Sequence, residues 1–373
     1  MNQEMSKKNM LDFVAESPAA IAANVKNRRE LTGKLVDRYV DGGYQNIRIV
    51  ACGSSSNGAS CAKQFLKTVL HCDVQIVTPL TFLSCDHQLS ETDFVFVVSQ
   101  SGYSTNSIDA LKLLRSMGRT AIGLTGDLNS DFKEYADILI DYGVGVETVG
   151  YVTKGVTTLA LFLMLFGLGA AFRKGLVGEK EKNQYLDCFE KVPEIHKMVQ
   201  EKTAEYYETY YKEFTSMTNA YLCSVGSNMG TAMEGALKIG ETVKVPTACY
   251  EAEEYIHGPN LQLTPAYTIF LIEGGVATDR IYGIFQATRI VTDKVFLLTN
   301  HGQSDGKGVL YFPFEMDELI TPLCFLPFFQ ILAHRVTEDL NRWRQHPLCT
   351  RMEKEASSKS ANYINSPLKL SGY

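Results

Sequence analysis

The same local pattern occurs in both halves of the sequence. At NIRIVACGSSSNGASCAKQFLKTVL (46–70) and NAYLCSVGSNMGTAMEGALKIGETV (219–243), a strand-like apolar run leads through a Gly/Ser-rich turn into a helical pattern. The two turns, GSSSNGAS and GSNMGTAM, are also similar to each other. Two homologous domains are the simplest explanation.

Further strand-like segments continue this alternation. They are predicted at residues 73–79, 93–99 and 120–126 in the first half, and at 267–275 and 294–300 in the second. Each is followed by a helical or loop segment, which favours parallel sheets covered by helices over antiparallel sandwiches. We therefore expect the α/β fold class, and 373 residues suffice for two cores of ordinary domain size.

Local signals also divide the chain. A charged stretch with two glycines, RKGLVGEKEKN (173–183), precedes a long helical pattern, and Ser17 with Pro18 is typical of the start of a helix through Arg28. The predicted division is an N-terminal helical segment (1–34), a first domain (35–183), a helical linker (184–216), a second domain (217–345) and a C-terminal tail (346–373).

Composition excludes several classes of partner. The chain has 36 basic and 42 acidic residues and a net charge of -6, so we expect neither a nucleic-acid nor an anionic membrane partner. Nine cysteines without a CxxC pair or companion histidines predict reduced thiols and no metal site. The N-terminus lacks the apolar core of a signal peptide, so we expect a cytoplasmic protein.

One apolar segment is long enough to cross a membrane. GVTTLALFLMLFGLGAAF (155–172) carries no charge, but Thr157, Thr158 and three glycines dilute it. Its neighbours have the strand and helix patterns of a globular domain. We predict a helix buried in a core or a subunit interface.

A polar turn follows the segment 93–99. In VFVVSQSGYSTNSIDALKLL (95–114), Ser99, Gln100, Ser101 and Ser104 stand between a strand and a helix, and Gly102 allows a ligand to approach the backbone. Hydroxyls beside the free N–H groups of a helix start can bind phosphate, here without a cation in the turn. GxxxxGK[ST] and GxGxxG are both absent, which favours a small phosphorylated metabolite over a nucleotide. Serines that merely cap a helix are the alternative.

Two further segments carry groups able to move protons. In EGALKIGE, Glu234, Lys238 and Glu241 have the spacing of one helix face, although such faces are usually just solvated. His257 precedes Gly258 and Pro259 at a turn, where a histidine is usually a surface or capping group. The residue types and their spacing do not decide between a catalytic role and a surface role for either segment.

The motifs SQSGYSTNS, ACGSSS and SNMGTAMEGALKIGE, followed by HGP at 257–259, resemble the sugar isomerase (SIS) domain family. Their order resembles the isomerase half of glucosamine-6-phosphate synthase over roughly residues 35–345, and HPLCTR (346–351) resembles the tail of fructosamine-6-phosphate deglycases. The resemblance implies two SIS domains of flavodoxin-like, three-layer α/β/α topology. It also implies a homodimer with shared active sites, a small-molecule phosphosugar ligand and no cofactor.

The resemblance also implies roles for individual residues. Ser99, Gln100, Ser101 and Ser104 would hold the phosphate with help from Ser55, while Cys52, Ser54 and the turn from Gly150 to Thr153 would line the sugar. Glu241 would be the base for C1/C2 proton transfer, Lys238 a nearby active-site lysine, and His257 a ring-opening group lent by the neighbouring subunit. Where the family usually reads SQSGETADT, this chain has Tyr103 and Ser104, so the hydroxyl function is kept and a carboxylate is lost.

The expected activity is that of a deglycase acting on a phosphorylated amine-linked sugar. About 35 residues precede the first domain, so we do not expect glutamine-dependent synthesis. An aldose–ketose isomerase or deaminase of amino-sugar phosphates is the alternative enzyme. A sugar-phosphate sensor is the alternative from another class, and Glu241 with His257 favours catalysis over it.

Overall fold

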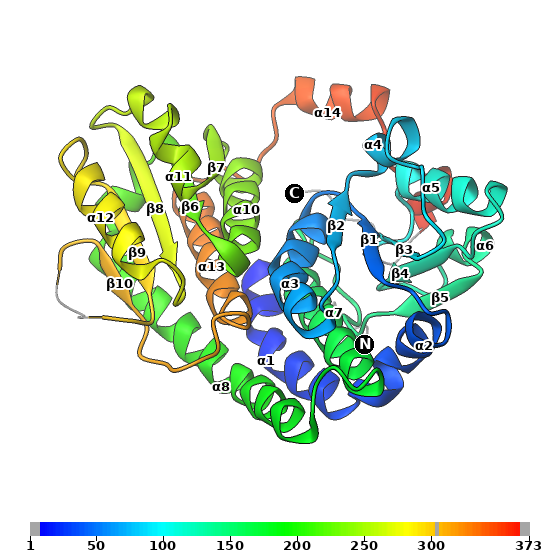
Figure 1. Cartoon of the computed structure of the whole chain (residues 1–373). Helices are drawn as coiled ribbons and strands as arrows, with labels where there is room; N and C mark the ends of the chain where they lie inside the picture. Colours follow the sequence, from blue (N-terminus) through cyan, green and yellow to red (C-terminus); the bar gives the residue numbers. More distant parts are fainter. Residues whose placement is uncertain (1–7, 303–305, 366–373) are drawn as a thin grey trace, which may run out of the picture.

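The computed structural model describes residues 8–302 and 306–365 and contains two parallel five-stranded sheets (Figure 1). The first sheet has the order β2 (Val74–Val77), β1 (Asn46–Val50), β3 (Asp93–Val98), β4 (Ile122–Thr125), β5 (Ile138–Asp141). The second has the order β10 (Val309–Tyr311), β9 (Val295–Thr299), β8 (Tyr267–Glu273), β6 (Asn219–Ser224), β7 (Thr247–Glu251). The predicted α/β fold with two parallel-sheet units is confirmed.

Helices cover the sheets and connect their strands. The first unit contains α2 (Arg28–Asp41), α3 (Ser54–Leu70), α4 (Pro79–Ser84), α5 (Thr105–Ser116), α6 (Phe132–Tyr135) and α7 (Lys154–Arg173). The second contains α10 (Met229–Lys238), α11 (Ala252–Ile256), α12 (Thr278–Thr288) and α13 (Pro322–Asp339), with 3-10 turns η1 (Gly226–Asn228) and η3 (Pro259–Gln262) and the π-helical turn η2 (Ile239–Val243). The remaining helices are α1 (Met10–Lys26), α8 (Glu179–Thr209), α9 (Tyr211–Thr215), α14 (Pro347–Glu355) and η4 (Ala361–Asn365).

The five strands predicted from the sequence outside the duplicated pattern are all present. Three were missed, namely β5, β7 and β10. The residues of β7, TACYE, are all half-buried, and β10 has only 3 residues. Such short or partly exposed edge strands lack the continuous apolar run that marks a buried strand.

The long apolar segment forms α7. This helix has the length and hydropathy of a membrane span, with a mean hydropathy of 2.0, but 89% of that window is buried inside the protein. Gly58 of α3 fits against α7, because a Cβ there would lie 3.0 Å from the carbonyl oxygen of Val156. The prediction of a helix buried in the core is confirmed.

The predicted helix start at Ser17 is wrong. Asn9 caps α1 instead, because its side chain accepts from the backbone N–H groups of Leu11 and Asp12. Pro18 therefore lies inside the helix, where it cannot donate to the carbonyl of Val14. That carbonyl accepts a hydrogen bond of 3.1 Å from Gln200 Nε2 on α8, which compensates for the missing donor.

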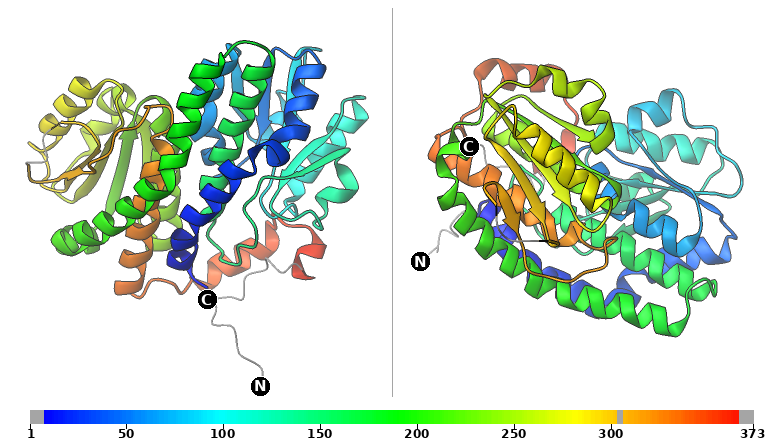
Figure 2. Two further views of the ribbon diagram at one scale, coloured as in Figure 1. Left: turned by 90° about the horizontal axis from the view of Figure 1, so that it is seen from below. Right: turned by 60° about the vertical axis from the view of Figure 1, so that its left-hand side comes forward.

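Three long helices, α1, α8 and α13, lie beside one another and join the two units (Figure 2). The linker helix α8 begins at Glu179, somewhat before the predicted linker boundary at residue 184. The division into domains otherwise stays a prediction.

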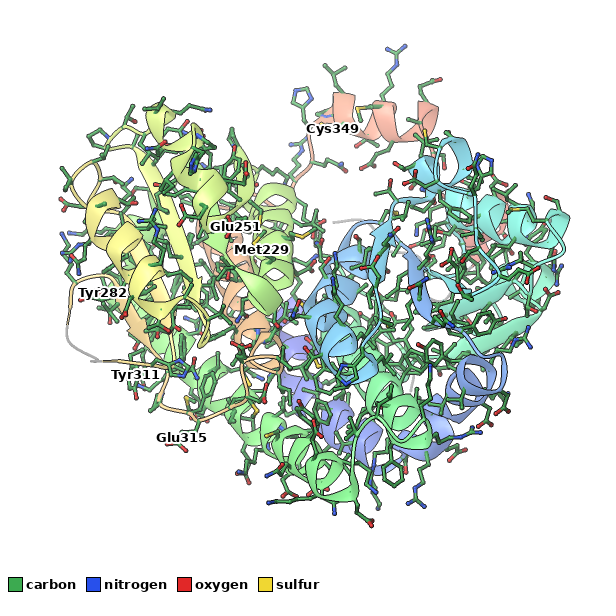
Figure 3. The ribbon with its side chains drawn as sticks, viewed as in Figure 1. Met229, Glu251, Tyr282, Tyr311, Glu315 and Cys349 are labelled. Carbon is green, nitrogen blue, oxygen red and sulfur yellow. The ribbon has the colours of Figure 1, made fainter. Side chains whose placement is uncertain are left out.

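The most direct contact between the units is made by α3 and α10. Gly230 permits it, since a Cβ there would lie 2.3 Å from the backbone nitrogen of Cys61. Met229 marks the start of α10 on the second-unit side of this contact in Figure 3. The approach brings the first turn of α3 against the later turns of α10, where the candidate catalytic residues lie.

Candidate functional site

Residues 99–104, called the serine turn below, link β3 to α5, and hydrogen bonds of the Ser99 hydroxyl hold the turn together. Ser99 Oγ accepts from the backbone N–H of Gly102 at 3.2 Å and donates to Ser104 Oγ at 3.1 Å. Gly102 has a φ of 67°, a left-handed conformation that favours glycine. Ser104 is the N-cap residue of α5, yet its side chain makes no capping hydrogen bond to the helix. Helix capping therefore does not account for the Ser104 hydroxyl.

Gln100 connects the serine turn to the start of α7. Its Nε2 donates to Glu147 Oε2 at 2.5 Å, and the Glu147 carboxylate also accepts from the backbone N–H groups of Thr153, Lys154 and Gly155 at 2.7 to 2.9 Å. Burial raises the pKa of Glu147, and these hydrogen bonds oppose the rise. Glu147 thus fixes the turn of Gly150 to Thr153 beside Gln100, a role that sequence reasoning missed.

Thr153 and Gly150 differ in what they offer a ligand. Thr153 is fully buried, and its hydroxyl donates to the carbonyl of Tyr151 at 2.7 Å. Gly150 is half-buried in the same turn. The predicted sugar contact of Thr153 stays a prediction, and its hydroxyl is already engaged.

The loop after β1 brings the other predicted sugar-binding residues to the same edge of the sheet. Cys52 is exposed, and its Sγ lies 3.9 Å from Asn106 Nδ2 in the first turn of α5. Ser54 and Ser55 begin α3; Ser54 is buried and Ser55 half-buried. The β1 and β3 loops therefore meet at the carboxyl ends of their strands, as ligand sites in open α/β sheets do.

Lys238 is the centre of a buried charge cluster between the two units. Its Nζ lies 3.2 Å from Glu234 Oε1, 2.5 Å from Glu241 Oε1 and 3.3 Å from Ser54 Oγ. Glu234 also accepts from Ser54 Oγ at 3.0 Å and from Asn57 Nδ2 at 2.8 Å. The predicted shared face of Glu234, Lys238 and Glu241 is confirmed, and it contacts the first turn of α3.

Glu241 differs from Glu234 in its access to solvent. The Glu241 side chain is 29% exposed and lies on the π-helical turn η2, whereas that of Glu234 is 1% exposed. Single π-helical turns occur frequently at functional sites, because they change the direction of one side chain. Glu241 is therefore the carboxylate of this cluster that a ligand can reach.

The surroundings of Glu241 raise the pKa of its carboxyl group. Burial raises its pKa, and the charge of Glu234 adds to the rise, while Lys238 opposes it without cancelling it. Burial alone would lower the pKa of Lys238, but Glu234 and Glu241 raise it above its usual value. The site thus contains a fixed cation beside a carboxylate whose pKa is shifted toward neutrality, as general bases require.

His257 lies apart from this cluster. It is exposed on the turn after α11, and its Nδ1 lies 2.7 Å from the carbonyl oxygen of Glu253. Among the described residues, no hydrogen bond or ion pair joins His257 to Glu241. Its proposed use by a neighbouring subunit stays a prediction.

The C-terminal tail adds a cation that sequence reasoning missed. Lys359 Nζ donates to Ser101 Oγ at 2.8 Å and to Ser104 Oγ at 3.2 Å. Its position more than 250 residues after the serines explains why no local pattern revealed it. The serine turn therefore has a cation after all, supplied from outside the turn.

The second sheet carries a different group at the equivalent position. Strand β8 corresponds to β3 in sheet order, and Glu273 at its end accepts from Gly275 N, Thr278 Oγ1 and Thr299 Oγ1, each at 2.6 Å. A buried carboxylate there would repel a phosphate. The hydroxyl-rich turn of the first unit is accordingly the better phosphate site.

Comparisons with known proteins agree with this geometry. Residues 44–168 match the model of the SIS domain. The glutamine–fructose-6-phosphate aminotransferase (isomerizing) of Thermotoga maritima is 26% identical over 86% of this chain and 53% of its own length. This chain thus spans about half the length of the curated relatives that it matches.

Solved structures share the fold. A candidate phosphosugar isomerase from Clostridium difficile 630 superimposes with a TM-score of 0.85 at 22% identity, over 95% of this chain and 100% of that one. The C-terminal domain of a glucosamine–fructose-6-phosphate aminotransferase from Francisella tularensis gives 0.81 at 19% identity, over 90% and 98%. Glucosamine-6-phosphate deaminase from Thermotoga maritima gives 0.70 at 16% identity, over 89% and 94%. Residues 44–168 of this chain therefore match a SIS domain, and the chain is similar in sequence to the isomerizing glutamine–fructose-6-phosphate aminotransferases and shares the fold of their C-terminal domain.

Proposed function

We propose that this chain is a phosphosugar deglycase that cleaves a fructosamine- or glucosamine-type sugar 6-phosphate from its amine. The observation that carries the proposal is the partly exposed Glu241 carboxylate, held against Lys238 with a raised pKa. Lys238 also contacts Ser54, so the base lies next to the loop that meets the serine turn. The homology to phosphosugar-isomerising proteins supports a sugar-phosphate enzyme as the general class.

The proposed reaction uses one base and one water molecule. Glu241 removes a proton from C1 of the open-chain amine adduct, which gives an enaminol, and returns a proton to C2, which gives an imine at C1. Water adds to C1 of the imine, and the C1–N bond breaks with protonation of the nitrogen. The products are an aldose 6-phosphate and the free amine.

The cation beside the base has a defined part in this scheme. Proton removal at C1 places negative charge on the C2 oxygen, and a preorganised cation lowers the energy of such a charge. Lys238 is fully buried between Glu234 and Glu241 and hydrogen bonded to Ser54. Lys238 would act on the substrate indirectly. It orients the Ser54 hydroxyl by a hydrogen bond, and it stabilises the ionised form of Glu241.

His257 would assist ring opening from the partner subunit of a homodimer. Its exposed position on the α11 turn supports this proposal, because a residue lent across an interface must lie on the surface of its own subunit. Reduced cysteines and the balanced composition support a cytoplasmic protein whose substrate is a small molecule.

An aldose–ketose isomerase or deaminase of hexosamine 6-phosphates is the second candidate. It would use the same base, and the fold shared with glucosamine-6-phosphate deaminase favours it. A non-catalytic sugar-phosphate sensor would keep the serine turn but would have no use for a pKa-shifted carboxylate.

Product analysis tests the proposal. The protein is incubated separately with fructosamine 6-phosphate linked to an amino acid and with glucosamine 6-phosphate, with Glu241→Gln as the matched control. A deglycase releases an aldose 6-phosphate and the amino acid from the first substrate, and Glu241→Gln releases neither. Ammonia and a ketose 6-phosphate from the second substrate alone would establish a deaminase instead, and an isomeric amino-sugar phosphate without ammonia would establish an isomerase. No product from either, with binding retained, would favour the sensor.

A further inference from the structure

The segment Ser357–Tyr363 of the C-terminal tail forms a strap along the start of α5. Two backbone hydrogen bonds hold it there, from Thr105 N to the carbonyl of Ser358 at 3.0 Å and from Ser360 N to the carbonyl of Tyr103 at 2.9 Å. Ser104 and Lys359 form the antiparallel bridge between them. The strap is reached through α14, which crosses between the two units and carries the labelled Cys349 in Figure 3.

Side chains also fix the strap at its far end. Asn362 Nδ2 donates to Asp131 Oδ1 at 3.0 Å, and the rings of Tyr363 and Tyr103 have centroids 5.6 Å apart. These contacts involve the turn before α6 and the serine turn itself. The strap therefore has a defined register, which decides where each of its side chains points.

This register places the Lys359 ammonium in the serine turn. Two of its three N–H donors bind Ser101 and Ser104, and its Nζ lies 5.3 Å from the centre of the Tyr363 ring. Among the described residues, no carboxylate lies within ion-pair distance of it. Burial lowers the pKa of Lys359, and the nearby Cys52 sulfur opposes this change.

The half-buried Lys359 ammonium has hydroxyl partners but no negatively charged partner among the described residues. Moving a charge out of water costs free energy unless an opposite charge or enough hydrogen bonds compensate for it. Hydroxyls can also donate to an anion, and the N-terminus of α5 favours negative charge at the same place. The Lys359 ammonium, the hydroxyls of Ser101 and Ser104 and the N-terminus of α5 therefore all favour an anion at this position.

We propose that Lys359 is the phosphate-recognising cation of the site, carried to the serine turn by the strap. The inference rests on the proposed function, because it identifies the group that selects a phosphorylated sugar at that same site. A phosphate would complete the charge of Lys359 with charge-assisted hydrogen bonds, which are stronger than those of neutral hydroxyls. Phosphate binding and docking of the strap would then stabilise each other, because the bound phosphate contacts both Lys359 of the strap and the hydroxyls of the serine turn.

Calorimetric titration of matched variants tests the proposal. Lys359→Gln removes the charge and keeps a hydrogen-bonding side chain, Lys359→Arg keeps the charge, and Lys354→Gln makes the same charge change on the exposed face of α14. The probes are inorganic phosphate, fructose 6-phosphate and fructose. Thermal unfolding of each variant establishes that it is folded.

We expect Lys359→Gln to weaken fructose 6-phosphate and phosphate binding by at least about tenfold, because a charge-assisted contact is lost. Lys354→Gln should stay within about twofold of wild type, and Lys359→Arg should keep most of the affinity. Equal affinity of Lys359→Gln and wild type, or an equal loss in Lys354→Gln, would overturn the proposal.

A second measurement needs no substitution. Trypsin must take Lys359 into its own pocket to cleave after it, so a phosphate bound to Lys359 in the docked strap should slow this cleavage. Fructose 6-phosphate should protect the bond and fructose should not; equal cleavage with both sugars would contradict the proposal. If affinity depends on Lys359 but no amine adduct is turned over, the proposed function fails while this inference stands.

Discussion

At the scale of single residues, the proposed function depends on one lysine that contacts two carboxylates. Lys238 lies between Glu234, which is buried and hydrogen bonded to Ser54 and Asn57, and Glu241, which solvent can reach. The buried carboxylate keeps the lysine charged, and it also raises the pKa of the exposed one. Burial raises the pKa of Glu241, Lys238 opposes the rise, and the Glu234 charge adds to it.

The pH dependence of catalysis should show this coupling. Glu241 must be ionised to accept a proton, so activity falls as the pH drops through its pKa. Because that pKa is raised, the acid limb of kcat/KM should lie above the usual range of glutamate. Glu234→Gln removes a charge that raises the pKa of Glu241, so this limb should move to lower pH. A limb that stays in place or moves to higher pH in Glu234→Gln would contradict the assignment.

The serine turn gives a prediction about binding. Ser99→Ala with Ser101→Ala removes two hydroxyl donors, and each hydrogen bond to a charged group is worth about 1.5–3 kcal/mol. Sugar-phosphate affinity measured by calorimetry should fall at least about tenfold while the protein remains folded. Unchanged affinity in the double variant would mean that these hydroxyls serve only the conformation of the turn.

At the scale of elements, the site depends on how closely α3 and α10 approach. Gly230→Ala would put a Cβ 2.3 Å from the backbone nitrogen of Cys61, which no side-chain rotation can relieve. Overpacking of this kind typically costs about 1–3 kcal/mol. Chemical denaturation should show that loss of stability, and activity should fall because Ser54 and Glu234 are moved apart.

Gly33 provides the matched control for this substitution. It lies inside α2, and a Cβ there would meet nothing within 4 Å. Gly33→Ala should stabilise the protein by about 0.5–1 kcal/mol, because alanine is the better helix former. Similar effects of the two substitutions would show that the α3–α10 contact is not tightly packed.

Features set by local sequence were predicted correctly, whereas features that depend on contacts between distant elements were missed. Patterns within about one helix or strand sufficed for β3, for α7 and for the common face of Glu234, Lys238 and Glu241, because each depends on local periodicity. The start of α1 was misplaced, because Gln200 on α8 satisfies the carbonyl that Pro18 leaves without a donor. Lys359 and Glu147 were missed for a similar reason, since each acts on a turn brought to it by the fold.

At the scale of the whole molecule, the exposed His257 makes the proposed site incomplete in a single chain. We predict a homodimer, so sedimentation should give twice the 41.5 kDa mass of one chain. A stable monomer at micromolar concentration would remove the shared site.

Mixing two impaired variants makes the test more specific. Glu241→Gln and His257→Ala should complement each other in mixed dimers, where one of the two sites regains both groups. Random exchange of subunits should restore about a quarter of wild-type activity, since half of the dimers are mixed. No recovery after verified subunit exchange would place His257 outside the partner's site.

The central claim is that Glu241 moves a proton between C1 and C2 of a phosphorylated sugar. Wild type and Glu241→Gln are incubated in D₂O with a fructosamine 6-phosphate adduct, and the deuterium at C2 of the product is followed by NMR. We predict deuterium at C2 with wild type, and turnover lower by about 10²–10⁴-fold in Glu241→Gln with substrate binding retained. Undiminished turnover by Glu241→Gln would contradict the claim.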